Sequence, residues 1–197
     1  MTLPNFFVEE NKILSALFDE GLELLHLRKP DTEAIYSERL LTLLPKEYRN
    51  KIVVHDHFHL KSEYGLKGIH LNHRNPLPPK GYSGQISCTC HTLEEIKLHH
   101  KSFNYLFYSP TFPTTTSNNE IGKTVSEQLR EASKKGIIDK KVIAFGGVTL
   151  KNISIAKDLN FGGVVILRDF WNRFDIHSTT SFKELCYYFR QLRKATD

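Results

Sequence analysis

The sequence predicts an α/β fold, namely a single compact (β/α)8 barrel of the TIM type whose first strand is short or missing. Short β-branched or apolar runs alternate with longer amphipathic runs along the chain, which is typical of parallel strands covered by helices. No linker and no break in composition interrupts residues 1–197, so one domain is expected. Only a short apolar remnant precedes the first helical run, which indicates the defective first strand.

Seven runs have strand character, because each is short, apolar and rich in β-branched or aromatic residues. They are residues 22–27, 52–55, 68–71, 85–88, 105–108, 141–145 and 163–167. A closed eightfold barrel needs one more strand before the first helix. Residues 1–7 either form a stunted strand there, or the chain is truncated at its N-terminus.

Six further runs carry apolar residues at helical spacing. They are residues 10–19, 32–44, 92–100, 126–135, 152–159 and 182–194. Thr32 stands where an N-cap is expected. The segment between Leu71 and Gln85 is rich in Pro and Gly and cannot hold a full helix, so this crossover is abbreviated.

The composition is that of an ordinary globular protein, with 40% hydrophobic and 25% charged residues. No apolar run approaches the about 20 residues that cross a bilayer. The first residues lack the basic and apolar segments of a signal peptide. Cys88, Cys90 and Cys186 form no disulfide framework. A cytoplasmic protein with reduced thiols is therefore expected.

The charge balance is mildly basic, with 27 Lys and Arg against 22 Asp and Glu. The basic residues are scattered among acidic ones, and no cluster of them is interleaved with aromatic residues, which argues against nucleic acid as a partner. A small positive excess suits anionic small molecules. We expect small phosphorylated substrates as partners, and neither nucleic acid nor a membrane.

The predicted strand ends carry most of the polar residues that suggest chemistry, and barrels of this type build their active sites there. Gly146-Gly147 and Gly162-Gly163 flank the last two strands, where they either cradle a phosphate with backbone N–H groups or only permit tight turns. Asp56 is either a Mg²⁺ ligand, since hard cations prefer carboxylate oxygens, or a helix cap.

Histidines alternate at His55, His57 and His59, a spacing that could bring two of them to one Zn²⁺ ion on a strand. Strand character fades after His55, and no further cluster completes the ligand set. Cys88 and Cys90 are closer in sequence than structural zinc pairs usually are. The G-x-S-x-G, Walker A and G-x-G-x-x-G motifs are absent from the sequence, so serine-hydrolase, P-loop and Rossmann functions are unsupported.

Taken together and in order, these segments resemble the thiamine phosphate synthase/TenI family. The matching pieces are Leu27-Arg28-Lys29, Ile52-Val53-Val54-His55-Asp56, Gly68-Ile69-His70-Leu71, residues 87–95, residues 105–114, residues 142–148 with Asn152, and residues 161–165. The resemblance runs from about residue 8 to about residue 170 and implies the barrel that the periodicity predicts.

The resemblance implies a transferase of thiamine biosynthesis, of the thiamine-phosphate diphosphorylase type. Such an enzyme joins hydroxymethylpyrimidine diphosphate to a thiazole phosphate, forms thiamine phosphate and releases diphosphate, with Mg²⁺ as cofactor. By motif, the resemblance implies catalytic roles for Arg28, Lys29 and Asp56, Mg²⁺ ligation by Asp56 and Asn75, and substrate contacts from His26, His55, Thr89, Thr114, Thr116 and Gly147.

The chain departs from the family pattern at three positions. Pro30 replaces a Lys, Asn75 replaces a second Mg²⁺-binding Asp, and Ser117 replaces a Lys. One alternative is therefore a TenI-like protein without synthase activity, either a thiazole tautomerase or a non-catalytic binder of thiazole or thiamine phosphate. A more remote alternative is a metal-dependent barrel hydrolase that uses His55 and His57. The missing strand also favours pairing into a homodimer.

Overall fold

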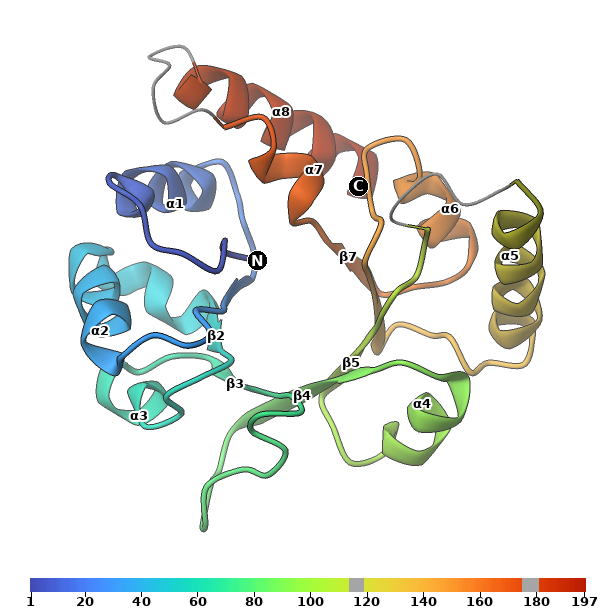
Figure 1. The fold of residues 1–197 in the computed structure, drawn as a ribbon, viewed down its shortest axis with the longest axis horizontal. Coiled ribbons are helices and arrows are strands. Elements are labelled where there is room, and N and C mark those ends of the chain that lie inside the picture. Colours follow the sequence, from blue (N-terminus) through green and yellow to red (C-terminus); the bar gives the residue numbers. More distant parts are fainter. Residues whose placement is uncertain (114–118, 175–180) are drawn as a thin grey trace. The chain divides into compact units, whose positions relative to one another are not determined.

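The computed structural model describes residues 1–113, 119–174 and 181–197. Side chains are described from Glu127 onward in α5 (Asn119–Lys134) and from Phe182 onward in α8 (Ser181–Thr196). The chain divides into two compact units. Unit 1 comprises residues 1–86 and 170–190, and unit 2 comprises residues 87–169 and 191–197. Both units consist of parallel strands and helices, and the strands follow the order of the chain from β1 to β7 (Figure 1).

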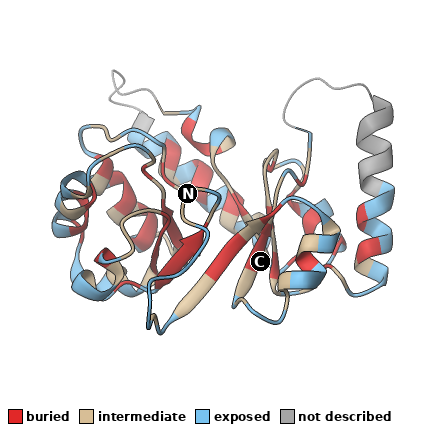
Figure 2. Cartoon of the chain, turned by 60° about the horizontal axis from the view of Figure 1, so that its bottom comes forward, coloured by how far each residue is buried: buried red, intermediate tan, exposed pale blue. Residues whose placement is uncertain are grey.

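Unit 1 contains three short parallel strands whose residues are all buried (Figure 2). They are β1 (Leu25–Leu27), β2 (Ile52–Val54) and β3 (Gly68–Leu71). Leu25 is in register with Ile52, and Val53 is in register with Gly68. Strands buried on both faces appear in the sequence as continuous apolar runs, which is why the sequence predicts them well.

Helices connect these strands and lie outside them in Figure 1. They are α1 (Glu10–Asp19), α2 (Ala34–Leu43), the 3₁₀ helix η1 (Lys46–Lys51) and α3 (Leu60–Tyr64). α1 begins and ends where the sequence predicts, and it buries Ile13, Leu14, Leu17 and Phe18 along one face. α3 is a single five-residue helix that the sequence did not reveal.

The N-terminal residues accompany β1 without forming a strand. The Thr2 backbone N–H donates to the His26 carbonyl oxygen at 3.0 Å, and the Arg28 N–H donates to Thr2 Oγ1 at 3.0 Å. In the described residues seven strands are present and none precedes β1, so a closed eight-stranded barrel is not the observed architecture. The prediction of a short or missing first strand is confirmed.

The crossover from β3 to β4 (Gln85–Cys90) contains no helix, as predicted. A Cβ atom on Gly68 would lie 2.4 Å from the Gln85 carbonyl oxygen, so a glycine is required for this close approach. Tyr82 Oη donates to the same carbonyl oxygen at 3.0 Å, and Lys61 Nζ donates to the Ser83 carbonyl oxygen at 3.2 Å. These hydrogen bonds fix the conformation of the crossover between β3 and β4, which contains no helix.

In unit 2, β4 from Ser87 onward pairs in parallel with β5 (Tyr105–Tyr108). β5 in turn pairs with β6 (Val142–Phe145), and β6 with β7 (Gly163–Val165). The remaining helices are α4 (Leu93–His99), α5 (Asn119–Lys134), α6 (Ile153–Asp158), α7 (Arg168–Trp171) and α8 (Ser181–Thr196). The α5 helix begins seven residues before its predicted start of 126.

Two threonines show how local chemistry sets helix starts. Thr92 caps α4, because its Oγ1 accepts a hydrogen bond from the Glu95 N–H at 3.1 Å. The prediction that Thr32 caps α2 is wrong: its hydroxyl donates to the Lys29 carbonyl oxygen at 2.8 Å, and the helix begins at Ala34.

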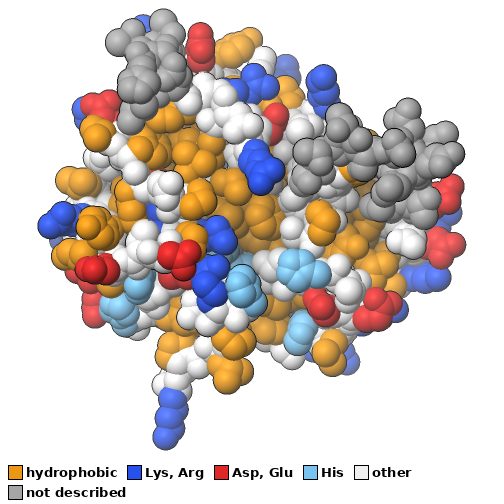
Figure 3. Space-filling model, viewed as in Figure 1, with side chains coloured by type: hydrophobic (Ala, Val, Ile, Leu, Met, Phe, Trp, Pro, Cys, Tyr) orange, Lys and Arg blue, Asp and Glu red, His pale blue; other side chains and the backbone are white. Residues whose placement is uncertain are grey.

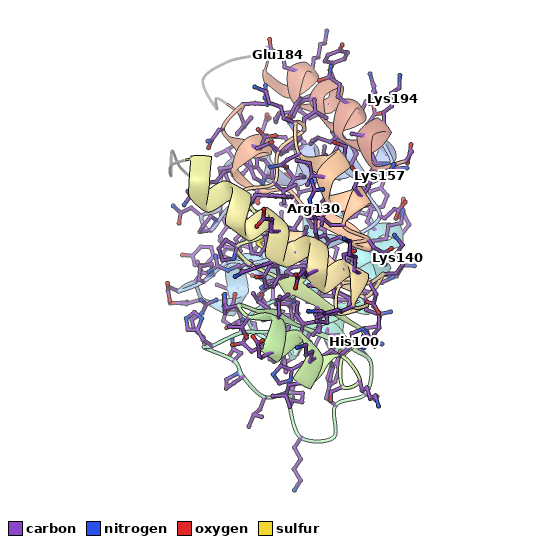
Figure 4. All side chains as sticks on the ribbon, turned by 90° about the vertical axis from the view of Figure 1, so that its right-hand side faces the viewer. His100, Arg130, Lys140, Lys157, Glu184 and Lys194 are labelled. Carbon is purple, nitrogen blue, oxygen red and sulfur yellow. The ribbon has the colours of Figure 1, made fainter. Side chains whose placement is uncertain are left out.

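Polar contacts also hold the loops that lead into the strands of unit 2. His100 Nε2 lies 2.8 Å from Asp139 Oδ2, and Lys141 Nζ donates to the His100 carbonyl oxygen at 2.7 Å. His100 and Lys140 are labelled in Figure 4. A Cβ atom on Gly162 would lie 1.9 Å from the Lys140 carbonyl oxygen. These loops precede strands, at the end where side chains generally serve stability.

No helix among the described residues is both long and apolar enough to cross a membrane.

Candidate functional site

The carboxyl ends of β1, β2 and β3 bring together most of the predicted residues of unit 1. His26 lies in β1 and Arg28 directly after it, His55 and Asp56 follow β2, and His70 lies in β3. Because neighbouring strands are parallel, these ends lie along the same edge. In barrels of this type, that edge carries the active site.

Three of these side chains form a buried histidine cluster, which we define as His26, His55 and His70. Their exposed fractions are 3%, 3% and 0%. His26 Nδ1 lies 2.8 Å from His55 Nε2. The His55 ring stacks on the His70 ring with centroids 4.2 Å apart, and His26 meets His70 edge-on at 5.2 Å.

Burial controls the charge of this cluster. Desolvation lowers the pKa of all three imidazoles, and the positive charge of Arg28 further lowers the pKa of His55 and His70. For His70 the result is a pKa of about 3. The three rings are therefore uncharged near neutral pH, beside the Arg28 guanidinium.

Asp56 is the acidic group at this edge, and its two oxygens have different surroundings. Oδ1 accepts from Arg74 Nη2 at 3.1 Å and from Asn75 Nδ2 at 3.3 Å. Oδ2 is buried and has no hydrogen-bond partner in the described part of the chain. A buried carboxylate oxygen without a donor is costly, and such an oxygen could hold a cation.

A tight turn after β3 positions Arg74 and Asn75. Asn72 Oδ1 accepts from the Arg74 N–H at 3.0 Å and from the Asn75 N–H at 3.2 Å. Asn72 and Asn75 both donate side-chain hydrogen bonds to the His55 carbonyl oxygen, at 3.0 and 3.2 Å. The turn is thereby fixed to the end of β2, where Asp56 lies.

Lys29 does not join this group of residues. Its ammonium lies 2.7 and 2.8 Å from the two Glu10 carboxylate oxygens and donates to the Asn5 carbonyl oxygen at 2.9 Å. It also lies 4.3 Å from the centre of the Phe6 ring. Lys29 is 1% exposed. The structure thus pairs the Lys29 ammonium with a buried carboxylate, whereas the family resemblance implies a catalytic role for it.

The strand alternation that could bring two of His55, His57 and His59 to one Zn²⁺ ion is not present. β2 ends at Val54, and His57 has a φ of 54°, so the alternation of an extended strand stops there. His57 Nε2 lies 2.7 Å from the Thr32 carbonyl oxygen, 25 residues away in sequence. His55 joins the histidine cluster, while the ring centres of His57 and His59 lie 6.2 Å apart, so the alternation that suggested a zinc site for His55 and His57 is lost.

In unit 2 the loop after β6 packs closely on the loop after β5. Gly146 and Gly147 have φ values of 85° and 67°, and a Cβ on Gly147 would lie 2.4 Å from the Phe112 carbonyl oxygen. The Phe112 N–H donates to the Gly146 carbonyl oxygen at 3.1 Å. Asn152 Nδ2 donates to the Gly147 carbonyl oxygen at 2.9 Å and fixes this turn. Both glycines are required by conformation.

The predicted hydroxyl ligands of unit 2 are only partly described. Thr89 lies in β4 between Cys88 and Cys90, and its Cα is in register with that of Phe107. Both cysteines are buried, so strand alternation directs Thr89 to the opposite face. Thr114 and Thr116, like Ser117, lie outside the described residues.

Sequence reasoning missed His70 and Arg74 as site residues. His70 stands within the quoted segment Gly68-Ile69-His70-Leu71, and its signal was a histidine in an otherwise apolar buried strand. Arg74 has no comparable signal, because only the turn made by Asn72 directs it to Asp56.

The fold and these strand ends define a parallel α/β protein of the barrel-enzyme type, equipped to handle anionic small molecules. One face of the molecule carries Lys, Arg and His side chains among hydrophobic ones (Figure 3). Residues 7–170 match the family model described as thiamine monophosphate synthase. The chain belongs to this family.

Known relatives agree with this assignment. A crystal structure of thiamine phosphate pyrophosphorylase from Bacteroides thetaiotaomicron is 49% identical, with a TM-score of 0.90, over 99% of this chain and 94% of that one. The thiamine-phosphate synthase of Phocaeicola vulgatus is 27% identical over 74% of this chain and 76% of its own. That of Flavobacterium johnsoniae is 25% identical, covering 82% of each.

Proposed function

We propose that this chain is a thiamine phosphate synthase, a transferase that joins hydroxymethylpyrimidine diphosphate to a thiazole phosphate and releases diphosphate. The observation that carries the proposal is the position of Arg28 and Asp56 at adjacent strand ends in a chain 49% identical to a thiamine phosphate pyrophosphorylase. Both residues match the family motif on which the resemblance rests.

In this proposal Arg28 binds the diphosphate. Its guanidinium is engaged by no ion pair or side-chain hydrogen bond within the described ranges, so it is available to an anion. As the bond between the pyrimidine carbon and the diphosphate breaks, negative charge grows on the departing oxygen. A fixed cation at that point stabilises the transition state, and removing one such group typically costs about 10²- to 10³-fold in rate.

Arg74 is the second cation of the proposed diphosphate site. It stands against Asp56, from the turn after β3. The family's Lys at position 30 is a Pro in this chain, and that loss removes a positive charge from the segment after β1. Arg74 supplies a charge of the same sign from a neighbouring strand end, which supports retained activity despite Pro30.

Asp56 fits the Mg²⁺ that the family implies, because its Oδ2 is buried and lacks a donor in the part of the chain described. Mg²⁺ supplies charge neutralisation of the diphosphate when bound. Asn75 fits less well, since its Nδ2 donates to Asp56 Oδ1 and only its amide oxygen could be a ligand. We therefore assign Asp56 as the principal protein ligand and Asn75 as its support.

In unit 2 we propose that Gly147 and the hydroxyls of Thr114 and Thr116 bind the thiazole phosphate. The support for Gly147 is its turn after β6, which Asn152 holds rigid and which has no room for a side chain. Backbone N–H groups in such turns are common phosphate ligands. Thr89 and His26 remain the proposed contacts for the organic parts of the substrates.

The decisive test supplies purified protein with hydroxymethylpyrimidine diphosphate, thiazole phosphate and Mg²⁺, and measures thiamine phosphate by fluorescence after oxidation. Product should form, and Arg28→Ala should remove it, while His59→Ala, a change elsewhere in unit 1, should leave turnover unchanged. Folded protein that binds thiazole phosphate but yields no product would contradict the synthase. It would favour the TenI-like alternative, which Pro30, Asn75 and Ser117 support.

A further inference from the structure

We propose that the histidine cluster of His26, His55 and His70 is a binding site for a divalent transition-metal ion of the Zn²⁺ type, separate from the Mg²⁺ site. Each imidazole offers one nitrogen, and these three nitrogens all lie within 4.8 Å of one another. The inference concerns metal binding by this chain and does not depend on synthase activity.

The fold itself brings the three ligands together. His26 lies in β1, His55 follows the last residue of β2, and His70 lies in β3. Parallel pairing fixes these neighbours, since His26 is in register with Val53 and Val54 with Ile69. A ligand set on three paired strands is already organised before the ion arrives, so little conformational entropy is lost on binding.

The distances suit an ion with nitrogen ligands. Zn²⁺ binds imidazole nitrogen at about 2.0–2.1 Å with tetrahedral geometry, which separates two ligand nitrogens by roughly 3.3 Å. His26 Nδ1 and His55 Nε2 now face each other at 2.8 Å. An opening of about half an ångström between these rings would admit the ion, and three histidines would leave its fourth position open.

The chemistry of the donors selects the class of metal. Uncharged imidazoles suit Zn²⁺, Cu²⁺ and related ions, whereas Mg²⁺ and Ca²⁺ require oxygen ligands. Burial of all three rings favours the uncharged form that binds metals. The nearby Arg28 charge opposes a cation and will weaken binding relative to an isolated three-histidine site. The carboxylate of Asp56, adjacent to His55 in sequence, acts in the opposite direction.

A second group in the described residues, Glu38, His59 and Glu63, also has ligand atoms within 4.8 Å. It is more exposed and mainly acidic, and such groups are common without a bound ion. It therefore provides the matched control: His59→Ala removes its histidine and leaves the buried cluster intact.

The experiment uses the full chain without a polyhistidine tag, stripped of metal and titrated with Co²⁺, whose visible absorption reports coordination geometry. One equivalent of four-coordinate Co²⁺ should bind and be displaced by Zn²⁺. His26→Gln and His70→Leu should each weaken binding by more than about 100-fold, since even residues that only support metal ligands cost 10- to 100-fold. The His59→Ala variant should bind like the unmodified chain.

Four results of the titrations would overturn the proposal: no stoichiometric binding, binding unchanged in both cluster variants, binding lost in His59→Ala, or a near-ultraviolet thiolate band that assigns the ion to Cys88 and Cys90. Circular dichroism establishes that each variant is folded. X-ray absorption of the Zn²⁺-loaded unmodified chain is independent of any variant. Three imidazoles in the zinc shell support the site, and a shell of sulfur or of oxygen alone contradicts it.

Discussion

Replacing Lys29 with Met should strongly destabilise this protein without acting on catalysis. Lys29 Nζ lies within 2.8 Å of both Glu10 oxygens, and the two side chains are 1% and 2% exposed. Removing one partner leaves the other charge buried and uncompensated, which typically costs about 3–5 kcal/mol. We expect a loss of that size in the free energy of unfolding at pH 7, measured by urea denaturation.

The double variant Glu10→Leu/Lys29→Met provides the control, because it removes both charges together. Replacing a buried ion pair by apolar residues of similar volume is often neutral or stabilising, so the double variant should recover at least about 2 kcal/mol of the loss. Burial raises the pKa of Glu10, and losing Lys29 raises it further. The deficit of Lys29→Met should therefore shrink as the pH falls from 7 to 5 and Glu10 becomes protonated.

Two outcomes would refute this reasoning. A loss below about 1 kcal/mol for Lys29→Met would mean that the ion pair contributes little, as for exposed pairs. A folded double variant that makes no thiamine phosphate, when the unmodified chain does, would show that the ion pair or Lys29 itself serves catalysis, as the family resemblance implies. Synthase turnover per folded molecule, measured beside the urea transition, separates these outcomes.

Three further predictions concern other residues of the two units. Arg28→Ala should lower kcat/KM of the synthase reaction by about 10²- to 10³-fold with an unchanged urea midpoint, because it removes charge stabilisation at a half-buried guanidinium that makes no ion pair within the described ranges. Gly147→Ala should destabilise by about 1–3 kcal/mol in urea, since its φ is 67° and the new Cβ would lie 2.4 Å from the Phe112 carbonyl oxygen. Burial lowers the pKa of His70 from 6.5 to about 3 in the folded protein, so the free energy of unfolding falls as the pH drops below 6.5. At pH 5, measured in urea with a chelator present, this group alone should lower that free energy by about 2 kcal/mol. The His70→Leu variant should not show this pH-dependent loss.

Most of the fold could be predicted, because its strands are short runs rich in apolar residues, and those of unit 1 are buried on both faces. All seven predicted strand runs correspond to β1–β7, with boundary errors of a few residues. β1 begins at Leu25, three residues after its predicted start, and β4 continues to Cys90. The missed helices α3 and α7 have five and four residues, too few for a periodic pattern to show.

The histidine cluster could not be predicted, because it is built across strands. Spacing within one segment predicts which residues share a face of a strand. On that basis the sequence suggested His57 as the residue that could share a metal ion with His55. The chain leaves the extended conformation after Val54, so that rule no longer applies. The actual partners, His26 and His70, lie 29 and 15 positions from His55 in sequence. Only strand register brings them together.

The different environments of Arg28 and Lys29 also depend on contacts with residues distant in sequence. The two residues are adjacent cations in the sequence, but their surroundings differ, because Lys29 is paired with buried Glu10 and Arg28 makes no ion pair within the described ranges. Thr2 holds the Arg28 backbone in place at both its N–H and its carbonyl oxygen. Glu10, at the start of α1, forms an ion pair with Lys29 in the buried core. In the proposed diphosphate site, the segment after β1 would therefore supply one cation, and Arg74, held on Asp56 by the turn after β3, would supply the second.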